Sequence, residues 1–82
     1  MFSINWQAYH TCSEAEKFIV EWKFGMTGGF KMALLETIAR ADTENLEKLR
    51  AGFPAEVEGY LKYSRETGWW EELKNRVSVS EK

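Results

Sequence analysis

The chain has 82 residues, of which 44% are hydrophobic, 29% are charged and 15% are aromatic. This length suits a single domain, since domains typically run to about 100–150 residues, and so apolar a composition argues against a disordered chain. The net charge of −2 creates no strong field for DNA or anionic lipid, so we expect neither nucleic acid nor a membrane as a partner.

The sequence leaves the structure of residues 1–12 open. Apolar and polar residues alternate from position 2 to position 8, as in a strand, but a lone strand would have no partner. A short helix that begins near Ser3 or Asn5 fits the same residues equally well. The segment lacks the basic start and apolar core of a signal peptide, and no run in the chain reaches the ~20 apolar residues of a membrane span. We therefore expect a cytoplasmic protein.

The next two segments carry clear helix signals. Ser13 and Glu16 fit a capping box, which predicts a helix over residues 14–24. Gly28, or the threonine before it, can cap a second helix with a broad apolar stripe, so we expect this second helix to be the most buried of the set. The stripe consists of Phe30, Ala33, Leu34, Leu35, Ile38, Ala39 and Ala41.

Three shorter helices follow. The first covers residues 44–51. The Gly-Phe-Pro run at 52–54 predicts a sharp joint, because glycine ends one helix and proline begins the next at its first turn. That second helix runs to Gly68, and a last one covers residues 69–77.

The predicted fold class is therefore all-α, a compact bundle of four to five short helices in one domain over residues 1–82. Within it, residues 1–12 are the uncertain N-terminal segment, and residues 78–82 form a frayed tail. A domain this small buries only about 60% of its unfolded surface. We expect its aromatic rings to be shared between the core and an interface, and this surplus of rings also predicts a homo-oligomer.

Charge spacing favours solvated helix faces over catalysis. Four acid–base pairs lie four residues apart in the favourable order: Glu36–Arg40, Glu44–Lys48, Glu58–Lys62 and Glu72–Arg76. Each such pair stabilises a helix by about 0.2–0.5 kcal/mol. A catalytic carboxylate pair would instead need burial or a like-charged neighbour to shift its pKa.

His10 and Cys12 are the remaining candidates for chemistry. The chain has one histidine and one cysteine, so it can form no internal disulfide and no zinc site of about four such ligands. Side chains two residues apart also diverge on a helix, which separates a base from a thiol. We expect no metal, no cofactor and no catalytic residue, and hence no enzyme.

One segment resembles an anion site. Gly28 and Gly29 stand at a helix start, where free amides and the helix dipole favour an anion, and Lys31 lies in the first turn. The spacing matches neither the dinucleotide nor the P-loop motif. The alternative is a tight turn between helices, in which glycine relieves crowding.

The Gly68-Trp69-Trp70 run predicts a contact surface. Adjacent helical residues point about 100° apart, so a narrow stripe cannot bury both rings. We expect one ring in the core and the other near the surface beside Tyr63, with Arg65 and Lys62 at the rim of a protein interface. The alternative is that both rings cover the open end of the bundle without meeting a partner.

These motifs resemble a group of short uncharacterised proteins encoded by phages and by integrated mobile elements of gut bacteria. The likeness spans residues 25–70, through the segments 29–42, 45–49, 52–57 and 68–70 together with Tyr60 and Tyr63. The group supplies no catalytic residue to carry over. What the resemblance implies is context, because small phage accessory proteins often bind host machinery stoichiometrically.

The resulting hypothesis is a non-enzymatic helical interaction protein in the bacterial cytoplasm. It is a phage-encoded accessory factor that binds and inhibits or redirects a host protein, such as a defence protein, through Trp70, Trp69, Tyr63, Arg65 and Lys62. The alternative is an oligomeric small-ligand binder that sequesters a nucleotide-like anion at the Gly28 helix start.

Overall fold

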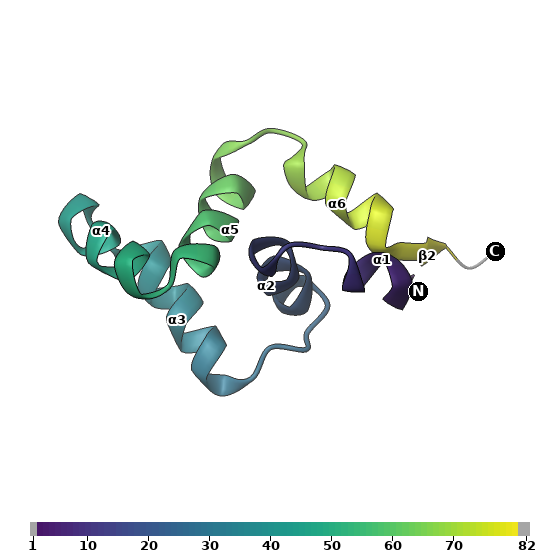
Figure 1. Cartoon of the computed structure of the whole chain (residues 1–82), viewed down its shortest axis with the longest axis horizontal. Helices are drawn as coiled ribbons and strands as arrows, with labels where there is room; N and C mark the ends of the chain where they lie inside the picture. Colours follow the sequence, from purple (N-terminus) through teal and green to yellow (C-terminus); the bar gives the residue numbers. More distant parts are fainter. Residues whose placement is uncertain (1, 81–82) are drawn as a thin grey trace.

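The computed structural model describes residues 2–80, and the side chains of residues 4–78. Six helices and one pair of short strands lie within that range (Figure 1). In chain order they are β1 (Phe2–Ile4), α1 (Trp6–His10), α2 (Glu14–Lys23), α3 (Gly29–Arg40), α4 (Thr43–Gly52), α5 (Pro54–Arg65), α6 (Trp69–Val77) and β2 (Ser78–Ser80). The all-α prediction is confirmed, and α1 is a further short helix in the segment that the sequence left open. No helix within residues 2–80 is long and apolar enough to cross a membrane.

Local signals placed most helix ends correctly. The capping box is formed, because Ser13 Oγ accepts from the Glu16 amide at 3.1 Å and Glu16 Oε1 accepts from the Ser13 amide at 2.8 Å. Asp42 caps α4 in the same way, accepting from the Asn45 amide at 2.8 Å. Pro54 occupies the first turn of α5 as expected.

Helix α2 lies at the centre of the molecule, where Figure 1 shows it nearly end-on between the other elements. It buries Ala15, Phe18, Ile19 and Val20 and packs most extensively against α5. The prediction that α3 is the most buried helix is therefore wrong. Helix α3 packs mainly on α5, so only one side of its broad stripe is covered: Ala33 and Ala39 are exposed and Phe30 keeps 70% of its surface accessible.

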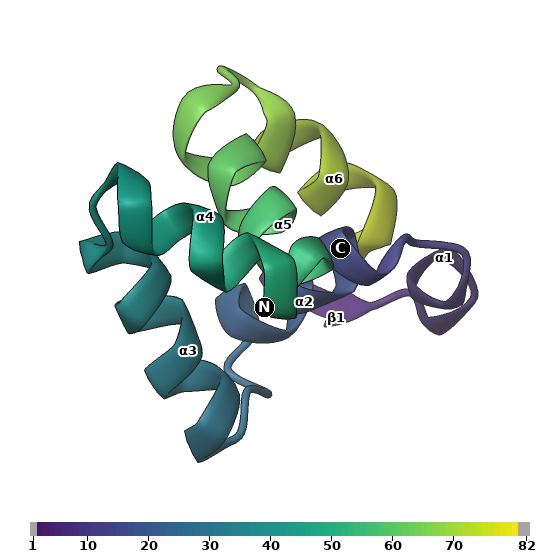
Figure 2. The same cartoon turned by 60° about the vertical axis from the view of Figure 1, so that its left-hand side comes forward.

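The crossing of α2 and α5, seen from a second side in Figure 2, depends on Gly59. A Cβ atom at this position would lie 2.5 Å from the carbonyl oxygen of Ala15. Because real Cβ atoms do not approach so closely, only glycine allows the two helices to pack at this distance. Sequence reasoning did not single out Gly59, since it lies within an otherwise ordinary helical stretch.

The two ends of the described chain pair with each other. Strands β1 and β2 are antiparallel, with Phe2 opposite Ser80 and Ile4 opposite Ser78. The expected fraying of residues 78–82 is thus wrong for 78–80, while 81–82 lie outside the described residues. The N-terminal strand does have a partner, but it comes from the far end of the sequence, where no hairpin signal could reveal it.

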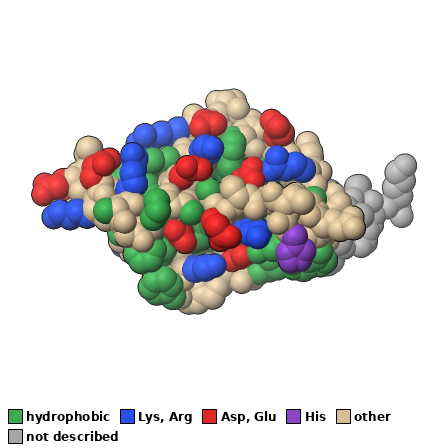
Figure 3. Space-filling view, viewed as in Figure 1, with side chains coloured by type: hydrophobic (Ala, Val, Ile, Leu, Met, Phe, Trp, Pro, Cys, Tyr) green, Lys and Arg blue, Asp and Glu red, His purple; other side chains and the backbone are tan. Residues whose placement is uncertain are grey.

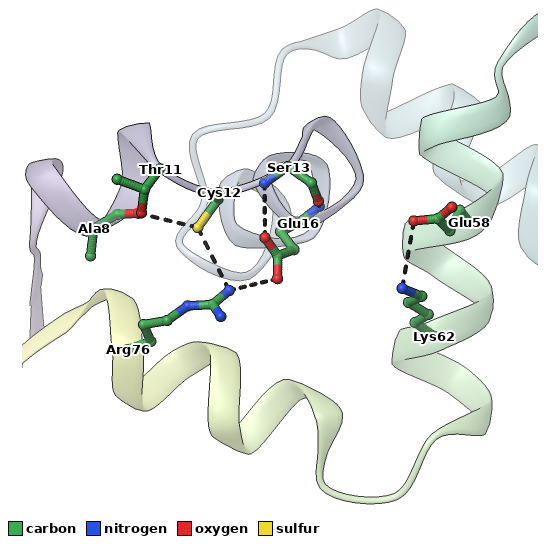
Figure 4. Close-up of polar contacts among 8 residues, drawn as sticks. All are labelled: Ala8, Thr11, Cys12, Ser13, Glu16, Glu58, Lys62 and Arg76. Atoms are coloured by element: carbon green, nitrogen blue, oxygen red, sulfur yellow. Dashed lines mark hydrogen bonds and ion pairs between the residues drawn. The ribbon is translucent and has the colours of Figure 1, made fainter.

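Arg76 ties α6 to α2 (Figure 4). Its Nη2 lies 2.6 Å from Glu16 Oε2, so it pairs across helices instead of with Glu72 as expected. Burial would raise the pKa of Glu16, but the Ser13 amide and Arg76 outweigh it and lower that pKa.

Of the other expected ion pairs, two are present. Lys48 and Glu44 lie 3.7 Å apart, and Lys62 and Glu58 lie 3.6 Å apart. Both pairs are solvent-accessible, so each adds little to stability. The part of the chain that the structure describes shows no ion pair between Glu36 and Arg40, and the charge spacing predicted that pair wrongly.

Candidate interaction surface

The two adjacent tryptophans of α6 diverge, as helical geometry requires. Gly68 adopts a left-handed conformation (φ +82°) and turns the chain sharply into α6. Trp70 lines a surface hollow with Tyr63, whereas Trp69 lines a separate, small cavity with Leu73. Both rings are half-buried and both pack against the core. Neither ring is therefore fully enclosed.

The hollow beside Trp70 gathers three of the five predicted contact residues. It has a volume of about 410 Å³ and is lined by Tyr63, Arg65 and Trp70, with Glu66 and Glu71 among its other walls. The turn between α5 and α6 brings these side chains together from two helices.

Lys62 and Trp69 lie apart from this hollow. Lys62 lines a neighbouring hollow of about 400 Å³, to which Arg65 also contributes, and it pairs with Glu58 at 3.6 Å. Trp69 faces the α2–α6 contact, where its small cavity is also lined by Glu16 and Arg76. The structure thus places these two outside the hollow that Tyr63 and Trp70 line.

Three rings converge on one ammonium group at this surface. Lys23 Nζ lies 5.1 Å from the ring centroid of Trp22, 5.2 Å from that of Tyr63 and 5.8 Å from that of Trp70. All three distances fall within the ~6 Å range of cation–π contacts, and the ammonium group meets Tyr63 from its hydroxyl side. Lys23 also donates a hydrogen bond of 3.2 Å to the hydroxyl of Tyr63. We refer to Trp22, Tyr63 and Trp70 as the aromatic cage.

Neighbouring rings hold the cage in place. Trp22 and Tyr63 meet edge to face with centroids 5.0 Å apart, and Phe24 contacts Trp70 in a similar way at 6.3 Å. Such pairs add about 0.5–1.5 kcal/mol beyond the area that they bury. All three cage rings are half-buried, so they are supported from below and accessible from outside.

Sequence reasoning missed Trp22 and Lys23. Trp22 has the helical spacing of an ordinary core residue, and Lys23 is a single charge near a helix end. Tyr63 follows Lys23 by 40 residues, so only the packing of α2 against α5 brings the two together. The available signal was the adjacent tryptophan and lysine at the C-terminal end of a helix, which is too common to predict a cage.

Other rings are exposed elsewhere. Phe30 is 70% exposed and Trp6 is 53% exposed. Figure 3 shows hydrophobic side chains near the start of α3 and beside the single histidine. His10 lies against the rings of Trp6 and Tyr9.

Cys12 does not pair with His10. Its thiol, which is buried, donates to the carbonyl oxygen of Ala8 at 3.3 Å. The imidazole of His10 lies against the rings of α1, and no contact among residues 4–78 joins it to the thiol.

In the predicted anion site, the cation Lys31 is paired with a carboxylate. Gly28 and Gly29 are exposed at the start of α3, and Gly28 is the residue that caps it. Lys31, however, lies with its Nζ 3.3 Å from Glu21 Oε1 on α2. This carboxylate offsets the positive charge that an anion would need.

Glu21 is a junction between three helices. Besides Lys31 on α3, it binds Tyr9 on α1, whose hydroxyl donates to Glu21 Oε2 at 2.5 Å. This hydrogen bond is the main reason that the pKa of Tyr9 rises to about 12, with burial and nearby negative charge adding to it. The role of this group is structural, because it fastens α1 and the start of α3 to α2.

No protein-family model, curated protein or solved structure matches the chain. Among the described residues, no group of three or more His, Cys, Asp or Glu side chains could hold a metal ion. The case for the candidate surface therefore rests on the positions of its own residues and not on a similar protein.

Proposed function

We propose that the protein is a non-enzymatic interaction protein and that Tyr63, Trp70 and Arg65 form the centre of its contact surface. The observation that carries the proposal is their convergence on one hollow of about 410 Å³. Tyrosine, tryptophan and arginine are the residues that most often dominate binding at protein interfaces. Because the two rings are half-buried, little side-chain freedom would be lost when a partner covers them.

The kind of partner rests on the resemblance over residues 25–70, which includes Tyr63 and Trp70. In this context the chain is a phage-encoded accessory factor that acts in the bacterial cytoplasm. It binds a host protein, such as a defence protein, and inhibits or redirects it. The mode of action is stoichiometric binding, so the protein needs no cofactor and no catalytic group.

Trp69 and Lys62 take a lesser part. Trp69 supports the surface from beneath through its contacts with the core, and Lys62 reaches a partner only if the interface extends to the neighbouring hollow. Arg65 lines both hollows, so it belongs to the contact surface in either case.

The test compares partner retention by surface variants. Tagged protein is incubated with bacterial host lysate, and retained proteins are quantified by mass spectrometry for wild type, Tyr63→Ala, Trp70→Ala and Arg65→Glu. We expect a specific host protein to be retained by wild type and lost from all three variants. Arg65 is exposed and belongs to none of the three core clusters of the described residues, so its variant keeps the test valid if Trp70→Ala destabilises the fold.

Trp6→Ala is the matched control, because it removes a ring that is 53% exposed on α1. Circular dichroism of each variant reports whether the helices are retained. If folded Tyr63→Ala and Arg65→Glu retain the same proteins as wild type, the surface has no role in binding and the proposal fails.

A further inference from the structure

The aromatic cage already holds a positively charged group. Lys23 Nζ sits within 6 Å of all three ring centroids, at 5.1, 5.2 and 5.8 Å. The negative faces of aromatic rings attract cations, and a set of such rings is how proteins bind quaternary and methylated ammonium groups. Here the occupant is supplied by the chain itself.

We propose that Trp22, Tyr63 and Trp70 form a binding site for a quaternary or N-methylated ammonium group, and that Lys23 is a built-in occupant which the ligand displaces. The inference rests on the proposed function, since it names the chemistry by which the partner would be held at Tyr63 and Trp70. It requires that Lys23 can leave, that the incoming group gains more from the rings than Lys23 does, and that the surroundings tolerate a cation.

Lys23 is free to leave. Its side chain is exposed and is held by the hydroxyl of Tyr63 at 3.2 Å and by the rings. A primary ammonium group is strongly hydrated, so it gives up solvation to lie over aromatic faces and regains it on swinging into water.

A methylated ammonium group profits more from the same site. Its charge is spread over apolar methyl groups, so it loses less hydration when it meets the rings, and the methyl groups also bury apolar surface against them. The exchange therefore replaces a cation that is costly to dehydrate with one that is less costly to dehydrate. It also frees the hydroxyl of Tyr63, a half-buried side chain, from its hydrogen bond with Lys23.

The charges around the cage suit a cation. Two of the three cage rings, Tyr63 and Trp70, also line the hollow of about 410 Å³, whose other walls include Glu66, Glu71 and a single arginine, Arg65. With Lys23 swung outward, the two carboxylates of this hollow favour an incoming positive group beside Tyr63 and Trp70. An anionic ligand would gain no such help.

The experiment measures choline binding to the isolated protein by calorimetry and by tryptophan fluorescence at constant ionic strength. Choline carries the trimethylammonium group, and its uncharged carbon isostere, dimethylbutanol, has the same shape without the charge. We expect saturable binding of choline, with millimolar affinity, and no saturable binding of dimethylbutanol. A Trp6→Phe background removes the emission of the exposed ring that solutes quench without binding.

Variants of the occupant and of the cage distinguish the site from a chance contact. We expect Lys23→Ala to bind choline more tightly by roughly two- to five-fold, the factor that corresponds to one exposed cation–π contact. Tyr63→Phe keeps a ring but removes the hydroxyl that holds Lys23, so it should bind at least as tightly as wild type. Tyr63→Leu removes the ring and should weaken choline binding by a similar factor, roughly two- to five-fold.

Three results would overturn the inference: no saturable binding of choline, choline binding that Lys23→Ala does not strengthen, or equal binding of the uncharged isostere. None of them touches the proposed function, because partner retention in lysate is measured separately and depends on Arg65 as well as on the rings. Conversely, saturable choline binding that Lys23→Ala strengthens would uphold the cage, and partner retention that is unchanged in the surface variants would refute the interface.

Discussion

Gly59 offers a direct test of how closely α2 and α5 approach each other. An added Cβ would lie 2.5 Å from the Ala15 carbonyl oxygen, 3.2 Å from its carbonyl carbon and 3.3 Å from Ile19 Cγ1. The first two atoms belong to the backbone of α2, so no side-chain rotation can relieve the overlap. A Gly59→Ala substitution must therefore push the two helices apart by the better part of an ångström.

The expected cost follows from two opposing effects. In a helix interior, alanine is better than glycine by about 0.5–1 kcal/mol. Overpacking a well-packed contact costs about 1–3 kcal/mol, and here the α2–α5 contact is the most extensive in the molecule. We expect Gly59→Ala to lower the free energy of unfolding by about 1–2 kcal/mol, or the Tm by about 4–8 °C for each kcal/mol in a domain of this size.

Gly52→Ala is the matched control. Gly52 is also helical, at the end of α4, its φ is not left-handed, and nothing lies within 4 Å of the position of an added Cβ. Only the favourable effect of alanine applies there, so this variant should be as stable as wild type or more stable by up to about 1 kcal/mol. Urea unfolding followed by circular dichroism measures both variants. If Gly59→Ala proves as stable as Gly52→Ala, the helices do not cross at the distance described.

Three further predictions concern charge and association. The hydrogen bond to Glu21 raises the pKa of Tyr9 to about 12. The stability that this bond adds to the fold is therefore complete below the ordinary tyrosine pKa of about 10 and is lost as the pH rises through about 12. Titration of tyrosinate absorbance, with Tyr9→Phe as reference, should show the Tyr9 pKa falling towards about 10 in Glu21→Gln, and an unchanged value would contradict this. The pKa of Glu16 is lowered, so the pH dependence runs the other way. The ionised carboxylate stabilises the fold above the ordinary carboxyl pKa, and this stabilisation disappears as the pH falls through the lowered pKa. Arg76→Met should cost about 1 kcal/mol or less at neutral pH and flatten that acid dependence in urea unfolding; equal pH dependence in both proteins would refute the assignment. Finally, we propose that the protein self-associates through exposed rings, so light scattering should show mass rising with concentration for wild type and less so for Phe30→Asp, whereas a monomer mass at every concentration would rule self-association out.

The sequence alone determined where most helices begin and end. Ser13 and Pro54 act on groups within three or four residues of themselves, so their effects can be read without knowing the fold. The divergence of Trp69 and Trp70 is equally local, because it follows from the 100° step between helical residues.

Only the tertiary structure decided what these helices meet. The aromatic cage joins Lys23 to a tyrosine 40 residues away, and Arg76 leaves its neighbour on α6 for a glutamate 60 residues away. The pairing of β1 with β2 likewise brings the two ends of the described chain together. Contacts of this kind depend on the order and angle in which amphipathic faces pack. Packing also made α2, and not α3, the most buried helix. Both helices have a face apolar enough to be buried, and only the arrangement of all the helices decides which face is covered more fully.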